Sequence, residues 1–292
     1  MSLHKEIWID HIQEGFYNDS SFLKSVTDMS HAVEYNRLHI ASAGMDPKVL
    51  IDNNTYPIEM AERADLEHVI EMKRFETENT IVRSLEAIEL AYDKQEDIIR
   101  QHRETLRNAT AKCALHAYAP MRHTAHTPVL RTTGETTADG RKRLTFNDIL
   151  DLKVAFDLAK YPAEGRYLVL NPHHVTDLLR EDLKMFKDLT EIINGEPKKF
   201  AGFGVYTFGD TPTYMQQSAG LEKQSFETAE QSKLFSSVAF IKSEVMKADG
   251  ECKMFATVND PTQRGDIFGF EKRFVALPIR NKGIGAIVSE QV

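Results

Sequence analysis

The stretch GRYLVLNPHHVTDLLREDLKMF, residues 165–186, contains the clearest strand-to-helix step in the chain. Its run YLVL predicts a short buried strand. Asn171 suits the N-cap of a helix, and Pro172 suits the first helical position. The stretch therefore predicts a strand that leads directly into a helix. The buried face of that helix is predicted to consist of Val175, Leu178 and Leu179.

The same stretch raises the alternative of a metal-dependent hydrolase. His173 and His174 are adjacent, so their side chains point about 100° apart on a helix. Two zinc-binding histidines on one helix face are instead separated by three residues, as in H-E-x-x-H. His173 and Asp177 could share a face, but two ligands leave a metal site incomplete. We interpret the three residues as structural and keep the hydrolase as an alternative.

A second group of candidate ligands lies at His116, His123 and His126, with Cys113 one helical turn before the first of them. Pro120 interrupts the helix within this group, and the spacing matches no zinc pattern. The chain also lacks a complete phosphate-binding glycine motif, a G-x-S-x-G elbow and a recognisable cysteine nucleophile. We expect no catalytic residues, no cofactor and no metal.

Composition restricts the class of protein further. The chain has 292 residues and 41% hydrophobic content, which is enough for a buried core. The net charge of -8 does not favour a surface that binds phosphates non-specifically. Cys113 and Cys252 are too few for a disulfide framework and are expected to be reduced thiols. No run approaches the ~18 apolar residues of a membrane span, so we expect a chain made in the cytosol without a membrane partner.

Residues 85–118 predict a long amphipathic helix. They contain neither glycine nor proline, and residues such as Ile99, His102, Leu106 and Cys113 recur at alternating steps of three and four. Acidic residues come early in the segment and basic residues come late, as the helix dipole favours. The thin apolar stripe suggests a helix that rests on a sheet.

The residues before this helix predict an antiparallel hairpin. Residues 69–75 alternate with the period of a strand, Glu76–Asn79 form a polar tip, and residues 80–85 are again extended. An isolated hairpin is marginal in water, so this one needs a neighbouring surface. The expected contacts with a second subunit are Phe75, Glu76, Thr77, Glu78 and Asn79.

The remaining segments mix helices and strands without a regular repeat. Residues 144–160 predict a helix with Thr145 as N-cap, residues 200–208 a second strand, and residues 209–233 a long loop. Further extended pieces follow, and the chain ends with a strand, a turn and a strand. This mixture predicts the α+β class.

The order of these pieces resembles a tailed-phage major capsid protein of the Hong Kong 97 fold. The similar pieces cover most of the chain from about Asp46 onward, and the most specific is RYLVLNPHHVTDLL paired with AGFGVYTF about thirty residues later. The others are NNTYPIEMAERADLEHVIEMKRFETENTIVRSLEAIELAYDKQEDIIRQHRETL and GFEKRFVALPIRNKGIGAIVSE.

The resemblance implies a division of the chain into the family's parts. Residues 1–54 would form an N-arm, and residues 55–91 an extended loop that overlaps a neighbouring subunit. Residues 92–143 and 251–292 would form a peripheral domain with a long spine helix, and residues 144–250 an axial domain.

The resemblance also implies a function. The chain would assemble with copies of itself, as pentamers and hexamers, into the icosahedral head of a tailed double-stranded DNA bacteriophage or prophage. It would be located in the virion capsid after assembly in the host bacterial cytoplasm. It would enclose DNA without sequence-specific binding, with a scaffolding protein, a portal and possibly a decoration protein as further partners.

Two family features have no counterpart that the sequence identifies. No long helical scaffolding segment precedes the arm, so a scaffold is expected to be a separate protein, unless the chain is already the mature form. Lys73 lies in the expected loop, but nothing marks it as a cross-linking residue. The nearest alternative is the shell of an encapsulin-like nanocompartment, which shares the fold.

Overall fold

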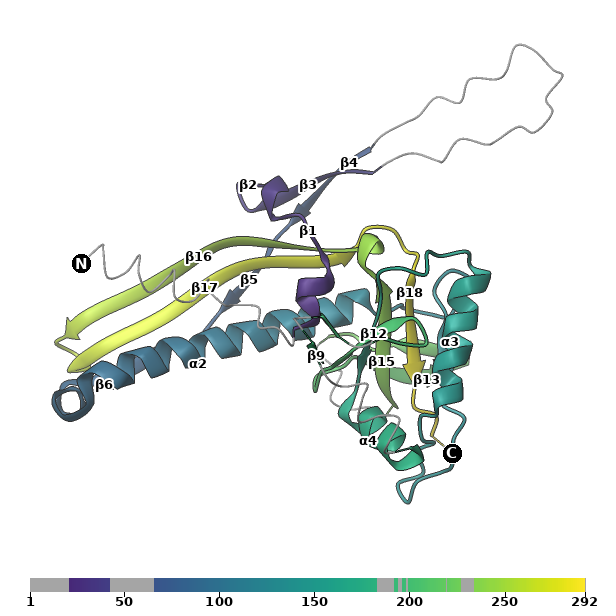
Figure 1. Ribbon diagram of the computed structural model, residues 1–292. Helices are drawn as coiled ribbons and strands as arrows, with labels where there is room; N and C mark the ends of the chain where they lie inside the picture. Colours follow the sequence, from purple (N-terminus) through teal and green to yellow (C-terminus); the bar gives the residue numbers. More distant parts are fainter. Residues whose placement is uncertain are drawn as a thin grey trace, which may run out of the picture.

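A computed structural model describes the following parts of the chain: residues 21–42, 66–182, 192–193, 196–197, 199–218, 220–226 and 234–291. A long helix and a two-stranded ribbon run side by side and lead into a larger sheet that has helices on both of its faces (Figure 1). Helices and strands alternate irregularly along the chain. The predicted α+β class is confirmed.

The long helix is α2 (Ser84–Tyr118), as predicted. His102, Leu106 and Cys113 of the expected stripe are buried. Farther along the same helix, Thr110 is buried and its hydroxyl donates a 2.9 Å hydrogen bond to the Leu106 carbonyl, so its polar group is satisfied without water. No helix in the described part of the chain is long and apolar enough to cross a membrane.

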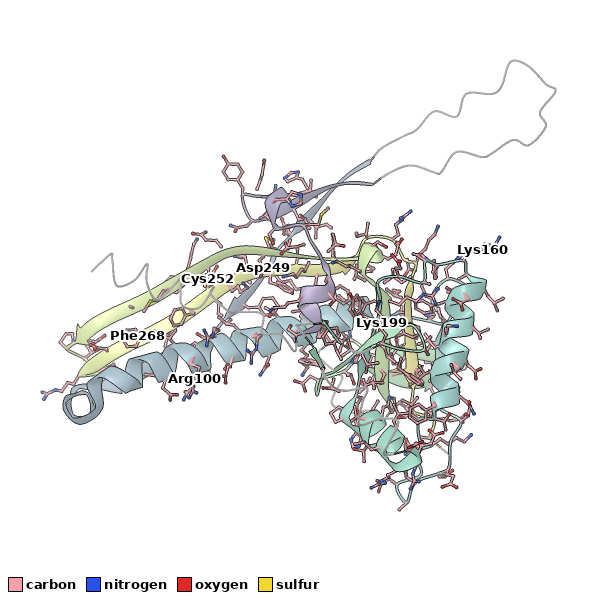
Figure 2. The ribbon with its side chains drawn as sticks, in the orientation of Figure 1. Arg100, Lys160, Lys199, Asp249, Cys252 and Phe268 are labelled. Carbon is pink, nitrogen blue, oxygen red and sulfur yellow. The ribbon has the colours of Figure 1, made fainter. Side chains whose placement is uncertain are left out.

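The ribbon consists of β16 (Val245–Asp260) and β17 (Gly265–Pro278), which pair antiparallel. Cys252 and Phe268 on the ribbon join Leu106 of α2 in one apolar cluster. Figure 2 labels both ribbon residues on the side of α2 opposite to exposed Arg100. The ribbon thus buries one face against the helix, as the thin stripe of α2 predicts.

The predicted hairpin within residues 55–91 is wrong for its described part. Strands β5 (Lys73–Glu76) and β6 (Thr80–Arg83) do not pair with each other, because both pair antiparallel with β17. The long β17 offers its free edge to the two short strands in turn. Glu76–Asn79 therefore connect two neighbouring edge strands and do not form a tip.

An antiparallel excursion does exist, but it begins earlier in the chain. Strand β3 (Arg37–Ser42), which was expected in the N-arm, pairs over its full length with β4 (Leu66–Glu71). Strand β2 (Val33–Glu34) adds a third strand through a tight turn in which Tyr35 and Asn36 have positive φ. Two such residues suit a type I′ hairpin turn. The expected parts at residues 1–20 and 43–65 lie outside the described residues.

The arm, which precedes β2 in the chain, runs along the start of the ribbon. It runs through a short 3₁₀ helix η1 (Phe22–Ser25), strand β1 (Thr27–Asp28) and a second 3₁₀ helix η2 (Ser30–Ala32). Strand β1 lies parallel to β16 and becomes the edge of the ribbon's sheet.

The larger sheet is built around three neighbouring strands. Strand β15 (Leu234–Ile241) lies between β8 (Arg166–Leu170) and β18 (Ile284–Val288), and pairs antiparallel with both. Its remaining strands are β7 (Val129–Arg131), β11 (Lys199–Phe200), β12 (Phe203–Thr207), β13 (Thr213–Gln217) and β14 (Gly220–Lys223). A separate small pair consists of β9 (Ile192–Ile193) and β10 (Glu196–Pro197).

Helices cover both faces of this larger sheet. Helices α3 (Phe146–Leu158) and α4 (Pro172–Glu181) pack on the face that carries Leu168 and Leu170. The C-terminal end of α2 and the arm helix η1 pack on the opposite face, which carries Val169. A strand buried on both faces reads as a continuous apolar run, which is why YLVL shows no alternation.

Other predicted segments need correction. The expected strand at residues 200–208 is broken at Ala201 and Gly202, whose positive φ values form the turn between β11 and β12. The loop expected at residues 209–233 contains the hairpin of β13 and β14.

The expected domain boundaries also differ from the sheets that the structure forms. β18 was grouped with the long helix, but it lies inside the larger sheet. β7, expected in the same domain as the long helix, lies beside β18. The boundary at Gly250 falls within β16, which pairs with β17 on both sides of a register shift between Asp249 and Cys252.

Candidate functional site

Helix α4 presents the two histidines and the aspartate of the metal hypothesis. Its N-terminus is capped as predicted, because the Asn171 side chain accepts a 2.9 Å hydrogen bond from the His173 N–H and Pro172 occupies the first turn. Leu178 is buried, and Val175 and Leu179 pack against the same cluster. The predicted apolar face is confirmed, and it turns the two histidines in different directions.

His174 is fully buried and uses both of its ring nitrogens. Its Nδ1 lies 2.6 Å from Ser237 Oγ, and its Nε2 lies 2.8 Å from Ser289 Oγ. Burial, with a smaller contribution from the Arg141 guanidinium, lowers the pKa of His174 from 6.5 to about 3. The imidazole is therefore neutral at physiological pH, and neither nitrogen is free to bind a metal ion.

The Asp177 carboxylate forms an ion pair with Arg141. The Arg141 guanidinium donates two hydrogen bonds to the Asp177 carboxylate, at 2.6 and 2.9 Å, and the Leu144 N–H donates a third at 3.1 Å. Such a bidentate pair fixes geometry as well as charge. His173 is exposed and stacks on Phe235 with 4.5 Å between ring centroids. Each of the three candidate ligands thus has a structural partner.

The second group of candidate ligands is also dispersed. Within the described residues, no three side chains of His, Cys, Asp or Glu lie together where they could hold a metal ion. The members contact different segments: His116 the Gln224 carbonyl, His123 the Val129 N–H, His126 the Tyr161 hydroxyl, and Cys113 the Lys73 ammonium.

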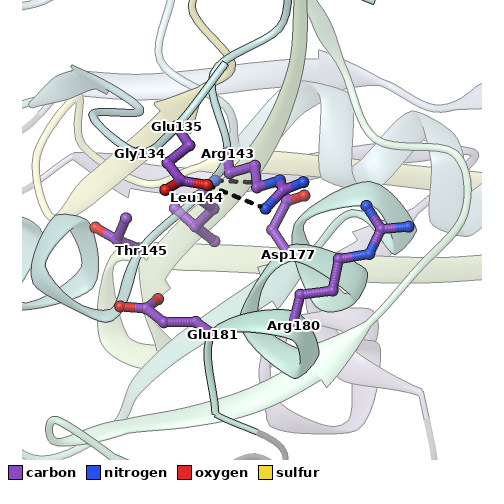
Figure 3. A pocket seen from close by; sticks show the side chains of 8 residues that line it. All are labelled: Gly134, Glu135, Arg143, Leu144, Thr145, Asp177, Arg180 and Glu181. Carbon is purple, nitrogen blue, oxygen red and sulfur yellow. Dashed lines mark hydrogen bonds and ion pairs between the residues drawn. The ribbon is translucent and has the colours of Figure 1, made fainter. Parts of the chain in front are cut away.

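A pocket of about 360 Å³ lies between α4 and the loop that precedes α3 (Figure 3). Arg143 reaches Glu135 at 3.6 Å, and Glu181 accepts a 3.0 Å hydrogen bond from the Phe146 N–H at the start of α3. Cations and carboxylates therefore offset one another along its wall. The described residues that line it include no histidine, cysteine or serine.

The residues predicted to contact a second subunit lie along the edge of β17. Phe75 packs edge-to-face on Phe274 at 6.2 Å. The Thr77 N–H donates a 2.9 Å hydrogen bond to the Phe270 carbonyl, and the Phe270 N–H donates a 3.0 Å hydrogen bond to the Thr77 hydroxyl. These two residues therefore hold β5 and β6 to their own chain.

Of the other three predicted contact residues, Asn79 contacts its own chain, whereas Glu76 and Glu78 are exposed. The Asn79 side chain lies so close to Gly269 that a Cβ atom there would come within 2.3 Å of Asn79 Oδ1. Any larger residue at Gly269 would require the Asn79 side chain to move. Glu76 and Glu78 are exposed and carry the negative charge of this edge.

The arm is fastened to the beginning of β16. The Met29 N–H donates a 2.8 Å hydrogen bond to the Lys247 carbonyl, and the Asp249 N–H donates a 2.9 Å hydrogen bond to Ser30 Oγ. Asp28 Oδ2 lies 3.5 Å from the buried Lys247 ammonium. Burial raises the pKa of Asp28, but hydrogen bonds from Ser30 and the charge of Lys247 outweigh burial and hold that pKa below its ordinary value.

No protein-family model and no curated protein matches the sequence. Solved structures do match the fold. The capsid of Cyanophage P-SCSP1u has a TM-score of 0.60 at 16% identity over 90% of this chain and 86% of that chain. The capsid of Ralstonia phage GP4 has a TM-score of 0.64 at 9% identity over 92% and 87%. The chain has the Hong Kong 97 fold.

The Hong Kong 97 fold also occurs in a structure that is not a phage capsid. The holo-SrpI encapsulin complex from Synechococcus elongatus matches with a TM-score of 0.56 at 10% identity, over 94% of this chain and 88% of that chain. The matches therefore identify the Hong Kong 97 fold, whereas the contents of a shell depend on something other than the fold.

Two features of this Hong Kong 97 subunit were missed in the sequence. The contact between Asp28 and Lys247 joins positions far apart in the chain, so no local sequence pattern predicts it. The apolar residues Leu150, Val154 and Leu158 were visible in the sequence, and their spacing of four marks a second face on α3. We predicted an amphipathic helix over residues 144–160 without distinguishing its two apolar faces.

Proposed function

We propose that the chain is the major capsid protein of a tailed double-stranded DNA bacteriophage or prophage, and that it self-assembles into the icosahedral head. The observation that carries the proposal is the shared fold over 90% and 92% of the chain with two phage capsid subunits. Because these neighbours are capsid subunits, we propose a structural role rather than an enzymatic one.

In this proposal each part of the fold takes a part in the shell. The excursion of β3 and β4 is the extended loop that lies on a neighbouring subunit, and it replaces the loop expected at residues 55–91. The ribbon with α2 is the peripheral domain. The larger sheet with α3 and α4 is the axial domain, and the residues before β3 are the N-arm.

The energetics of a shell suit these parts. A shell needs contacts that are individually weak, so that errors can be corrected, and collectively strong. An arm, a loop and a long ribbon offer many small surfaces rather than one large interface. The carboxylates of Glu76 and Glu78 fit that role, because both side chains are exposed at the edge of the described ribbon.

The partners follow from the same role. The chain would contact copies of itself in five- and six-membered rings, a scaffolding protein, a portal and, where the phage encodes one, a decoration protein. Its net charge of -8 suits a container for DNA that does not bind phosphates tightly. Its location would be the virion capsid, after assembly in the bacterial cytoplasm.

An encapsulin-like compartment is the second candidate. It is favoured by the match to an encapsulin. The hydrolase alternative has less support, because the ring nitrogens of His174 and the carboxylate of Asp177 are already occupied.

The test is the content of purified particles. Particles made in a lysogen or an infected host should contain double-stranded DNA that resists nuclease until the shell is opened. Particles filled with a cargo protein and free of DNA would instead establish the encapsulin-like reading. Stoichiometric zinc, manganese or iron in the purified protein would instead support the hypothesis of a metal-dependent hydrolase.

A further inference from the structure

Helix α3 carries apolar residues on two faces. Ile149, Leu152 and Phe156 are buried against the larger sheet. A second row, which we name the α3 row, consists of Leu150, Val154 and Leu158, with exposed fractions of 44%, 52% and 79%.

The α3 row points away from the sheet. Each residue turns a helix by about 100°, so the centre of this row lies almost opposite the centre of the buried row. The row is not a side extension of the core, and nothing in the described part of the chain covers it. A contiguous exposed apolar row of this kind marks an interaction surface.

A second apolar patch lies at the other side of the larger sheet, where α2 ends. We name it the α2-end patch, and it consists of Met121 and Phe226, with exposed fractions of 57% and 40%. The Phe226 ring packs edge-on against His116 of α2 at 5.5 Å. Because α2 and α3 cover opposite faces of the sheet, the two surfaces lie on opposite sides of this unit (Figure 1).

The charges beside the two surfaces are opposite. Asp151 is exposed next to the α3 row and has no ion-pair partner among the residues that the structure describes. Lys112 lies 5.9 Å above the Phe226 ring at the α2-end patch and likewise has no carboxylate partner there. The charges of Asp151 and Lys112 complement each other, whereas the neighbouring charges Lys153–Asp157 and Arg122–Glu222 are already paired.

We propose that the α3 row of one copy of this chain docks on the α2-end patch of the next copy, and that this contact repeats around a ring. The proposal rests on the proposed shell function and specifies one of its contacts. A contact between two different patches is heterologous, and it closes into a ring when the rotation between copies allows. The opposite placement of the two patches meets that requirement.

The size of the contact favours a second copy within an assembly over a stable dimer. Five side chains supply far less than the ~800 Å² per partner of a standard interface. Such a contact is too weak to hold two chains alone, and it suits one of several contacts between neighbours in a ring.

Disulfide trapping in assembled particles tests the proposal. The double variant V154C/F226C, oxidised with diamide, should give a ladder of covalent oligomers up to five or six chains on a non-reducing gel. The single variants V154C and F226C should remain monomers, because a heterologous contact needs both cysteines. The native Cys113 and Cys252 are buried, and oxidised parent particles serve as the background.

A second double-cysteine variant is needed in case the geometry of the first pair does not allow a disulfide. The variant L158C/M121C probes the same two surfaces at other positions. Dimers from V154C alone would overturn the proposal in favour of a two-fold contact between α3 helices. Intact particles without a ladder from either double variant would also overturn it.

Charge exchange provides an independent measurement. Asp151→Lys and Lys112→Asp should each raise the protein concentration needed for particle formation by about tenfold or more, and the double exchange should restore most of that loss. The control Thr105→Glu places a charge on an exposed position of α2 away from both surfaces. If parent protein forms no particles at all, the proposed function itself fails; if parent particles form and the two exchanges do not compensate, only the docking contact fails.

Discussion

The larger sheet and the ribbon are formed by strands of one chain, but they differ in what covers them. β18 is buried along its whole length, and β8 nearly so. On the ribbon, Cys252 and Met254 are buried while Lys253 and Phe255 are exposed. A subunit therefore completes its larger sheet by itself and leaves one face of its ribbon to solvent or to other molecules. Within the described residues, the two regions thus differ in how completely their strands are covered.

The largest expected effect tests that difference directly. Phe240 is buried in the larger sheet among Phe22, Tyr118 and Tyr167, so Phe240→Ala should lower the free energy of unfolding by about 3–5 kcal/mol. Phe255 on the ribbon is 54% exposed, so Phe255→Ala should change that free energy by less than about 0.5 kcal/mol.

The measurement is urea unfolding of dilute, unassembled subunits. Equal losses from the two alanine variants would mean that the ribbon face is covered within the subunit. That result would remove the distinction between the two regions.

An intermediate effect is expected inside the larger sheet at His174. His174→Gln should lower the free energy of unfolding by about 1–3 kcal/mol at neutral pH, because it leaves the hydroxyl of Ser237 or Ser289 without its partner. The exposed neighbour provides the matched control, and His173→Gln should have little effect.

The pH dependence sharpens this prediction. The pKa of His174 is about 3 in the folded chain and near 6.5 when unfolded, so below pH 6.5 the unfolded chain takes up a proton that the folded chain does not. The stability from neutral His174 is therefore complete above pH 6.5, and it falls by about 1.4 kcal/mol per pH unit toward pH 3. The difference between wild type and His174→Gln should therefore shrink below pH 6.5 and reverse sign before pH 3 is reached. A constant difference would contradict the neutral, buried state.

The smallest expected effect concerns the arm. Asp28→Asn removes one charge contact with Lys247 but leaves Asp249 beside that lysine, so the global free energy of unfolding should change by less than about 1 kcal/mol. Local opening should be more frequent. Hydrogen exchange of the Met29 N–H, which bonds to the Lys247 carbonyl, should become several-fold faster.

A control separates this local effect from a general change in charge. Asp97→Asn removes an exposed ion pair with Arg100 on α2 and should leave the exchange of Met29 unchanged. Unchanged exchange in Asp28→Asn would show that backbone pairing alone fastens the arm.

Local signals in the sequence predicted local structure well. Helix α2, the Thr145 cap of α3 and the Asn171–Pro172 start of α4 depend on residues within a few positions of one another. The interpretation of His173, His174 and Asp177 as structural also followed from helical geometry. The hydrogen bonds of both His174 ring nitrogens could not be predicted in this way, because Ser237 and Ser289 are distant in the sequence.

Pairing between distant strands was the part that the sequence did not reveal. Residues 73–83 have the pattern of a hairpin. Both of their strands instead form their backbone hydrogen bonds with the free edge of β17. β3 likewise has no local signal that assigns it to β4 rather than to the arm. Register and partner choice in sheets are tertiary properties, and a short segment carries little information about them.

Electron microscopy of the purified protein tests the shell directly. The chain should be expressed together with the genes that flank its own, so that any scaffold is present, and the purified material imaged in negative stain. We predict closed icosahedral particles built from five- and six-membered rings. A monodisperse monomer at high protein concentration under these conditions would contradict the proposed function.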